Sequence, residues 1–338
     1  MKKMLTCGLV GVGALAVPLG ASLALPLGAG ATAGAVTACT PTGFVVDNIN
    51  LTAAVIDPPA TVTGTIDATG CNIGVYFDSS HTGTVSATVK NANYFGIVNN
   101  GSTVNVTNSK VMNIGENPIA TNPLNGLQHG VGIYFGGGNS KGTIESNAVF
   151  NYQKNGIVVD GVGSSATISG NTVTGQGPVG YIAQNGIEVG YGAIATVSSN
   201  TVSANQYSGP GGASSAGILV FGGPWLGSGV PYTTGVSVSH NTVTNNDVGV
   251  YLYNAALDGS APLTATNDSV VNNTISDGLT SNVSGNGTGG YQAGISDFGN
   301  HDNIVNNKIS GNGYTATPPP GSVYKTIDIF GSTSPHVK

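Results

Sequence analysis

Residues 156–175 read GIVVDGVGSSATISGNTVTG, and this stretch contains the pattern that decides the fold. Ile157 and Val159 alternate on one short strand, and a second alternating strand ends at Ile168. Asn171 then marks a sharp turn before a third apolar strand. Helical spacing of apolar residues is absent, so the stretch predicts three short strands joined by turns.

The turn phrase, apolar-x-x-Asn-x-apolar, recurs along the chain. Ser109 holds the Asn position in the earliest copy, and successive asparagines are 24, 29, 41, 32 and 34 residues apart. Such a period indicates a solenoid with insertions confined to loops. We expect the turn amides of successive coils to bond one another as a ladder. The asparagines are Asn147, Asn171, Asn200, Asn241, Asn273 and Asn307.

A second phrase, a glycine followed by an alternating apolar strand, interleaves with the first. Strands of four or five residues bury too little alone, so successive coils must stack, at roughly 4.8 Å per coil, around an apolar interior. A further copy of this phrase, which lacks the leading glycine, lies at residues 327–330. The leading glycines are Gly74, Gly96, Gly132, Gly156, Gly186, Gly217, Gly249 and Gly294.

With these two phrases the chain resembles the right-handed parallel β-helix repeat proteins of the pectate-lyase-like superfamily, over about residues 60–331. The resemblance implies an all-β fold, a single-stranded right-handed parallel β-helix of about nine coils. It is weak evidence for function, because this scaffold carries many activities and some members have none known.

The amino-acid composition limits the classes of molecule that this protein is expected to bind. The chain has 54 Gly, only 7% charged residues, no Arg and a net charge of −6. This charge argues against nucleic acid and anionic membrane surfaces, and it makes polyanionic glycans less favourable. We expect no cofactor.

The N-terminus predicts export. Lys2 and Lys3 precede an apolar run broken by prolines and then a tract of small residues, which is typical of a secretory signal peptide over 1–38 rather than a membrane span. The interpretation is a secreted protein without membrane insertion beyond the signal. We further expect an N-terminal cap at 39–60, a β-helix domain at 61–331 and a tail at 332–338.

Two cysteines remain after removal of the signal. Cys39 and Cys71 most simply form a disulfide in a secreted chain. The alternative is lipidation of Cys39, because Val36-Thr37-Ala38-Cys39 resembles a lipobox.

Outward residues of the Gly-led strands, with the long loops beside them, predict a glycan-binding groove. Sugar rings pack on aromatic faces while their hydroxyls need polar partners. The alternative is a sheet simply covered by its loops. The predicted substrate-binding residues are Tyr134, Tyr251, Tyr253 and Phe221 on the strands and Trp225 and Tyr191 in the loops.

Three acids are candidates for catalysis. Asp160 and Glu188 fall on neighbouring coils in outward columns, about 8 Å apart between Cα atoms. Such a pair suits inverting glycoside hydrolysis by an acid and a base. Asp297 falls in an inward apolar column, where a buried carboxylate needs partners or a raised pKa; the alternative is a local bulge that turns it outward.

Other chemistries find less support. A pectate lyase would need acidic calcium ligands with an Arg or Lys base, and the Gly-led face has no suitable Lys. The signatures of polygalacturonase-like enzymes are missing, and His129 stands alone in the sequence. The histidines form no ligand-spaced cluster, so no metal site is predicted. A regular Thr array such as Thr172 and Thr174 resembles ice-binding surfaces, although outward Thr is also simply favoured in strands.

The sequence therefore predicts a secreted β-helix protein that binds an extracellular polysaccharide, with hydrolysis of that polysaccharide as a candidate activity. If it is an enzyme, it is a glycoside hydrolase rather than a pectate lyase. The alternative is a non-catalytic structural or adhesive solenoid of the cell envelope.

Overall fold

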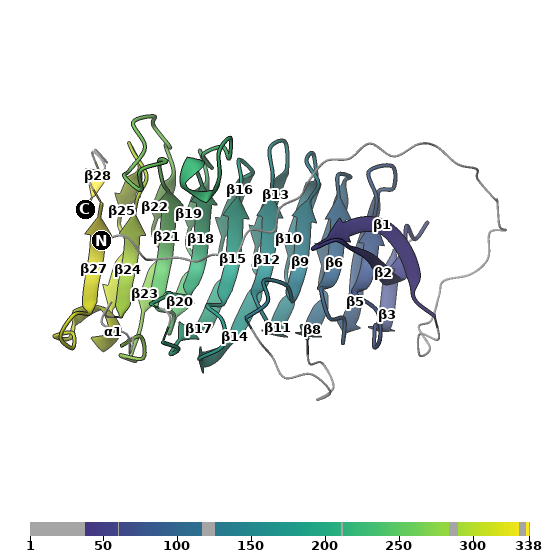
Figure 1. Ribbon diagram of the computed structural model, residues 1–338, viewed down its shortest axis with the longest axis horizontal. Helices are drawn as coiled ribbons and strands as arrows, with labels where there is room; N and C mark the ends of the chain where they lie inside the picture. Colours follow the sequence, from purple (N-terminus) through teal and green to yellow (C-terminus); the bar gives the residue numbers. More distant parts are fainter. Residues whose placement is uncertain are drawn as a thin grey trace.

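The computed structural model describes residues 38–59, 61–116, 126–210, 212–283, 290–330 and 336–337. In this part the chain is a stack of coils (Figure 1). One coil contains β12 (Asn155–Asp160), β13 (Ser165–Ser169) and β14 (Thr172–Val179), and each pairs in parallel with a strand of the next coil. The predicted repeat of three strands is confirmed.

An 11-stranded sheet carries the Gly-led strands. β1 pairs antiparallel with β2, and the later neighbours pair in parallel. The nine described strands from β4 to β27 correspond to the predicted nine coils. In order, the sheet contains β1 (Thr40–Val46), β2 (Ile49–Ile56), β4 (Ile73–Phe77), β6 (Phe95–Asn100), β9 (Val131–Gly136), β12, β15 (Asn185–Gly190), β18 (Ala216–Gly222), β21 (Val248–Asn254), β24 (Tyr291–Asp297) and β27 (Val323–Ile329).

The remaining strands form a 17-stranded sheet that bends at the Asn turns. Two short helices, η1 (Pro224–Leu226) and α1 (Asn312–Thr315), lie in connections, and no helix of the described residues is long or apolar enough to cross a membrane. The sheet contains β13, β14, β3 (Val62–Asp67), β5 (Gly83–Lys90), β7 (Val104–Thr107), β8 (Lys110–Ile114), β10 (Lys141–Glu145), β11 (Ala148–Tyr152), β16 (Ile194–Ser198), β17 (Thr201–Tyr207), β19 (Ser237–Ser239), β20 (Thr242–Thr244), β22 (Ser269–Val271), β23 (Thr274–Ser276), β25 (Asn303–Val305), β26 (Lys308–Ser310) and β28 (His336–Val337).

The interior is a continuous apolar column in which Ile157, Ile187 and Ile218 stack from coil to coil, fully buried. The leading glycines make this close stacking possible. A Cβ on Gly186 would lie 2.3 Å from Cγ1 of Val202 and 2.6 Å from the Gly217 carbonyl oxygen. Any larger residue at this position would push the strand away from the core.

The predicted Asn ladder is present. Asn171 Nδ2 donates to Asn200 Oδ1 over 2.9 Å, and Asn200 Nδ2 donates to Asn241 Oδ1 over 3.0 Å. Asn241 and Asn273 continue the series. Each side chain thus bonds its neighbour on the next coil.

The N-terminal hairpin does more than cover the end of the stack. β2 pairs with β4 and extends the sheet at its first end, while Phe44 of β1 packs over Tyr76 and Phe95 on the outward face. The disulfide between Cys39 and Cys71, predicted over lipidation, ties this hairpin to the first coil. The domain boundaries stay predictions, and the predicted signal peptide lies outside the described residues except for position 38.

Candidate functional site

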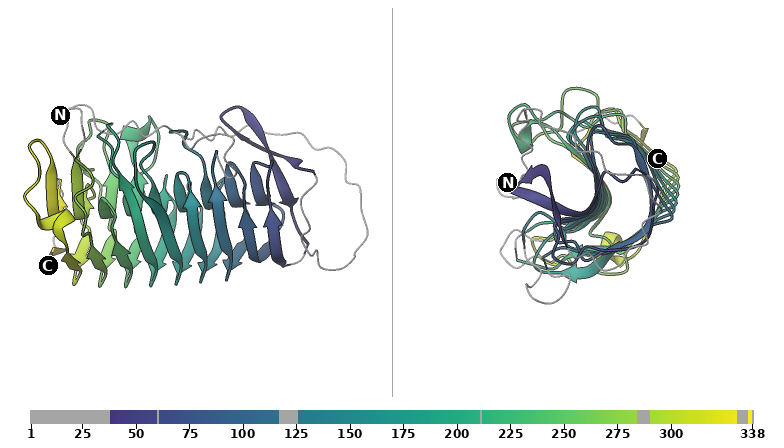
Figure 2. Two further views of the ribbon diagram at one scale, coloured as in Figure 1. Left: turned by 90° about the horizontal axis from the view of Figure 1, so that it is seen from below. Right: turned by 90° about the vertical axis from the view of Figure 1, so that its right-hand side faces the viewer.

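The outward face of the 11-stranded sheet is a covered floor rather than an open surface. Viewed along the axis, the hairpin lies against this face with loops on both sides (Figure 2). Two buried apolar clusters cover it, one under the hairpin and one under the loops after β18 and β21. Most of the predicted aromatic residues therefore pack within these clusters.

Tyr134 belongs to the cluster under the hairpin. Its ring centroid lies 5.2 Å from that of Phe95 and 6.3 Å from that of Phe44, and only 6% of the residue is exposed. A sugar ring could stack on Tyr134 only if the hairpin moved.

The other predicted aromatics gather further along the floor. Tyr253 stacks on Phe221 at 5.8 Å between centroids and meets Tyr251 edge-on at 5.3 Å. Tyr191 contacts Phe221 edge-on at 5.7 Å. Trp225 lies apart in η1, 38% exposed, near the backbone of Gly259. The structure thus brings Phe221, Tyr251, Tyr253 and Tyr191 together and leaves Trp225 outside.

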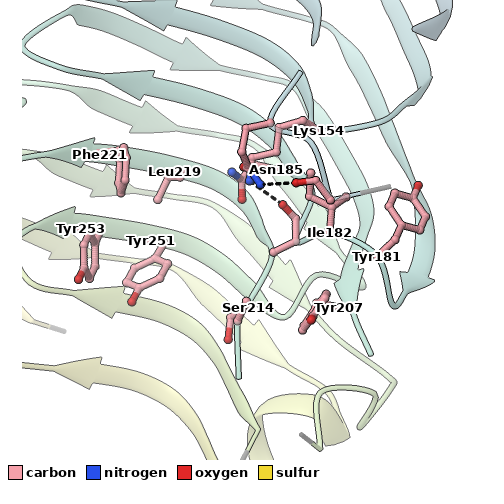
Figure 3. Close-up of a pocket in the computed structure, with 14 residues that line it drawn as sticks. Lys154, Tyr181, Ile182, Asn185, Tyr207, Ser214, Leu219, Phe221, Tyr251 and Tyr253 are labelled. Carbon is pink, nitrogen blue, oxygen red and sulfur yellow. Dashed lines mark hydrogen bonds between the residues drawn. The ribbon is translucent and has the colours of Figure 1, made fainter. Parts of the chain in front are cut away.

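A pocket of about 230 Å³ opens between this aromatic floor and two loops. Phe221, Tyr251 and Tyr253 lie on one side, and Tyr181 and Tyr207 lie on the other (Figure 3). Tyr181 lies in the connection between β14 and β15, and Tyr207 is the last residue of β17. The structure thus has a pocket over part of the face for which a groove is predicted.

Asp160 and Glu188 lie beside one another on neighbouring strands of the floor. Neither acid lines the pocket itself, but Glu188 accepts a hydrogen bond from Asn185, which does. β12 and β15 pair so that Val158 is opposite Glu188 and Asp160 is opposite Gly190. A Cβ on Gly190 would lie 3.3 Å from Asp160 Oδ1 and 3.7 Å from Glu188 Oε1, so these oxygens are at most about 7 Å apart. This upper limit on the distance between the two carboxylate oxygens is compatible with both inverting and retaining glycoside hydrolases.

The surroundings of Asp160 favour its protonated form. Burial raises the pKa of Asp160 to about 7, and the negative charge of Glu188 adds to the shift. Its Oδ1 atom is buried without a hydrogen-bond partner among the described residues. Asp160 is thus a carboxylic acid that can hold a proton near neutral pH.

Glu188 is buried too, and burial raises its pKa, but donors oppose the shift. Glu188 Oε2 accepts from Asn155 Nδ2 over 2.9 Å and from Asn185 Nδ2 over 3.2 Å, and the positive charge of Lys154 also favours the carboxylate. Burial thus raises the pKa of both acids, and at Glu188 the side-chain donors and Lys154 counter part of the shift.

Sequence reasoning missed Lys154, Asn155 and Asn185. Lys154 is 7% exposed, its Nζ donates to the Ala183 carbonyl over 2.8 Å, and with Asn185 it lines the pocket. These residues lie at or just before the strand start, ahead of the leading glycine, and were not counted as part of the outward face. The signal that could have found them is the repeated Asn before Gly156 and Gly186.

Asp297 does not join this pair. It pairs with Leu252 and Ile329 in regular register and is fully buried, so it lies in the inward column and no bulge turns it outward. It lies four coils from Asp160, roughly 19 Å along the axis. Its neighbour Asp302 has a pKa raised to about 7, first by burial and also by Asp297.

Three further expectations from the sequence can be compared with the structure. His129, which stands alone in the sequence, is paired through Nε2 with Glu116 and stacks on Tyr94 at 3.9 Å between ring centroids. The sequence predicts no metal site, because its histidines lack the spacing of metal ligands. In the structure, however, potential ligand atoms of Asp57, Asp78 and His81 lie within 4.8 Å of one another. The Thr array is aligned, with exposed Thr172 and Thr201 opposite one another.

Comparison with known proteins identifies the architecture. The family model described as right handed beta helix region matches residues 60–224 and 98–334. The crystal structure of the Dettilon tailspike protein is similar to this chain, with a TM-score of 0.45 and 15% sequence identity. The similarity covers 82% of this chain and 55% of the tailspike chain, so this chain spans about half the length of that protein. Among curated proteins, none matches this chain.

Proposed function

We propose that this chain, which belongs to the right-handed β-helix family, binds a neutral extracellular polysaccharide and hydrolyses it with Asp160 and Glu188. The observation that carries the proposal is the pair itself. Two carboxyl groups lie at most about 7 Å apart, and one of them, Glu188, is bonded to Asn185 in the wall of a pocket with an aromatic floor. Burial raises the pKa of Asp160 to about 7, so this acid can carry a proton near neutral pH.

The roles follow from the electrostatics. Asp160 donates its proton to the glycosidic oxygen, so that the bond to the leaving sugar can break without releasing an alkoxide. Glu188, whose carboxylate form Asn155, Asn185 and Lys154 favour against the effect of burial, removes a proton from the attacking water or attacks the anomeric carbon itself.

The pocket chemistry favours an uncharged sugar. Of the described residues that line it, Lys154 alone carries a charge, and that charge acts on Glu188. The faces of Tyr251, Tyr253 and Phe221 offer apolar area for a sugar ring, and Asn185 and Ser214 offer hydrogen bonds to hydroxyl groups.

Export is part of the proposal. The bond between Cys39 and Cys71 supports it, because disulfides persist in oxidising compartments. A predicted signal peptide at 1–38 is consistent with the same route.

The test is a reducing-sugar screen of the mature protein against neutral glucans, xylans and mannans. Asp160→Asn and Glu188→Gln should each lower turnover about 10²–10⁴-fold, the range of positioned proton transfer, and leave binding of the same glycan unchanged. Glu145→Gln, a matched change at an exposed acid of β10, should leave turnover unchanged.

A non-catalytic binding or adhesive role is the second candidate. The burial of the floor aromatics under the hairpin and loops favours it, since such packing stabilises the solenoid by itself. The same screen separates the two. Glycan binding that weakens in Tyr251→Ala, with no cleavage of any polysaccharide, would establish the binding role and reject the hydrolase.

A further inference from the structure

Three metal-binding side chains converge where the hairpin joins the first coil, away from the pocket. Oδ1 of Asp57, Oδ1 of Asp78 and Nδ1 of His81 lie within 4.8 Å of one another. Nδ1 of His81 is 2.8 Å from the Asp78 oxygen and 3.5 Å from the Asp57 oxygen. We propose that these side chains bind a divalent transition-metal ion of the class of Zn²⁺ or Mn²⁺.

The spacing of the donor atoms fits an ion between them. Metal–ligand bonds of about 2.1 Å place neighbouring donor atoms about 3.0 Å apart in octahedral geometry and about 3.4 Å apart in tetrahedral geometry. The separations from His81 Nδ1 bracket these values. Asp78 Oδ1 also accepts the backbone N–H and the hydroxyl of Ser80, so an ion would replace the proton between His81 and Asp78 and share this oxygen with Ser80.

The donor set determines the class of ion. One imidazole nitrogen with two carboxylate oxygens is a ligand set of first-row transition metals, whereas Ca²⁺ and Mg²⁺ prefer oxygen ligands alone. The side chains of His81 and Asp78 are 49% and 41% exposed, and that of Asp57 is 16% exposed. Water can therefore reach the ion and complete its coordination.

The ligands come from two segments that the fold holds in place. Asp57 follows β2, and its backbone N–H donates to the Tyr76 carbonyl over 2.8 Å. Its Oδ1 accepts the backbone N–H of Asp78 over 2.8 Å. The carbonyl of His81 accepts the Ser102 hydroxyl over 2.7 Å. The site is thus largely formed before an ion arrives.

Electrostatics favour a cation here. The carboxylates of Asp57 and Asp78 both approach Nδ1 of His81, at 3.5 Å and 2.8 Å. A cation in this position would therefore lie between two negatively charged groups. Because its ligands join the end of β2 to the turn after β4, the ion would clamp the hairpin to the first coil.

The experiment is a titration of the mature, tag-free protein, first stripped with a chelator, with Zn²⁺, Mn²⁺ and Ca²⁺ in separate calorimetric runs. We expect one Zn²⁺ or Mn²⁺ per chain and a higher melting temperature with the ion. His81→Ala and Asp78→Asn should each weaken this binding by at least about 10–100-fold. His240→Ala, which removes an exposed histidine in the turn after β19, should change nothing.

Several results would overturn the proposal. One is an absence of Zn²⁺ and Mn²⁺ binding to the folded wild-type chain. Another is binding that survives unchanged in both His81→Ala and Asp78→Asn. Selective Ca²⁺ binding that does not need His81 would also reject the imidazole ligand. The titration needs no glycan, so its outcome is independent of the proposed hydrolysis.

Discussion

At the scale of single residues, Asn200 shows how one side chain joins three coils. Its Nδ2 donates to Asn241 Oδ1 and to the Ile168 carbonyl, and its Oδ1 accepts from both the side chain and the backbone of Asn171. The residue is buried, so water cannot replace a lost partner. Removing the amide leaves several polar groups unsatisfied.

We therefore predict that Asn200→Ala lowers the free energy of unfolding by about 1–3 kcal/mol. Asn312→Ala, at an exposed position at the start of α1, should change it little because the helix bond there uses the backbone oxygen. Thermal and urea melts of the two variants measure the difference. Equal shifts in the two variants would show that the ladder contributes nothing specific.

The ladder asparagines could be predicted from sequence because their spacing repeats. The backbone conformation of the residue before each ladder asparagine could not be predicted from the sequence. Ser199, His240 and Asn272 share a left-handed backbone with φ of 56°, 56° and 58°, and no single residue type marks that position. Left-handed backbone is compatible with several residue types once neighbouring coils hold the turn.

At the scale of elements, the hairpin β1–β2 is where sequence and structure differ most. The cysteines predicted its tether and the prolines predicted a cap at 39–60. Its packing on the outward face was not predicted, because the partners of Phe44 lie on three separate coils. A sequence pattern shows which strand faces alternate but not which distant segment covers them.

The disulfide between Cys39 and Cys71 leads to a prediction about the mass of the protein. Its mass without reductant should be that of a chain two hydrogens lighter than the reduced form, with Cys39 retained. Because the bond closes a loop across a sequence separation of 32 residues, Cys71→Ala should cost about 3–4 kcal/mol. Amides of β1 and β2 should then exchange faster with solvent.

A diacylglyceryl mass on Cys39 would instead establish a lipid anchor and discard the bridge. Unchanged amide exchange in Cys71→Ala would show that apolar packing alone holds the hairpin. The wild-type protein with and without reductant serves as the matched comparison.

At the scale of the whole molecule, stacking of coils brings Asp160 and Glu188 together although they are 28 residues apart in the sequence. The spacing of the repeats predicted that the two acids lie on neighbouring coils. It did not predict how deeply the pair is buried, nor that Asn155, Asn185 and Lys154 favour the carboxylate of Glu188. Asn155 and Asn185 begin β12 and β15, so their alternation with the outward column was visible in the repeat, whereas burial depends on how the whole chain packs.

The account depends on Asp160 holding a proton near neutral pH, first because the carboxyl group is buried and also because Glu188 lies beside it. The direct measurement is a carbon NMR titration of the Asp160 carboxyl in the intact protein, assigned with Asp160→Asn. We predict a pKa of about 7, which should fall in Glu188→Gln while staying above 3.8, since burial is the larger cause. A carboxyl that titrates near 3.8 in the wild type, or one indifferent to Glu188→Gln, would contradict the account.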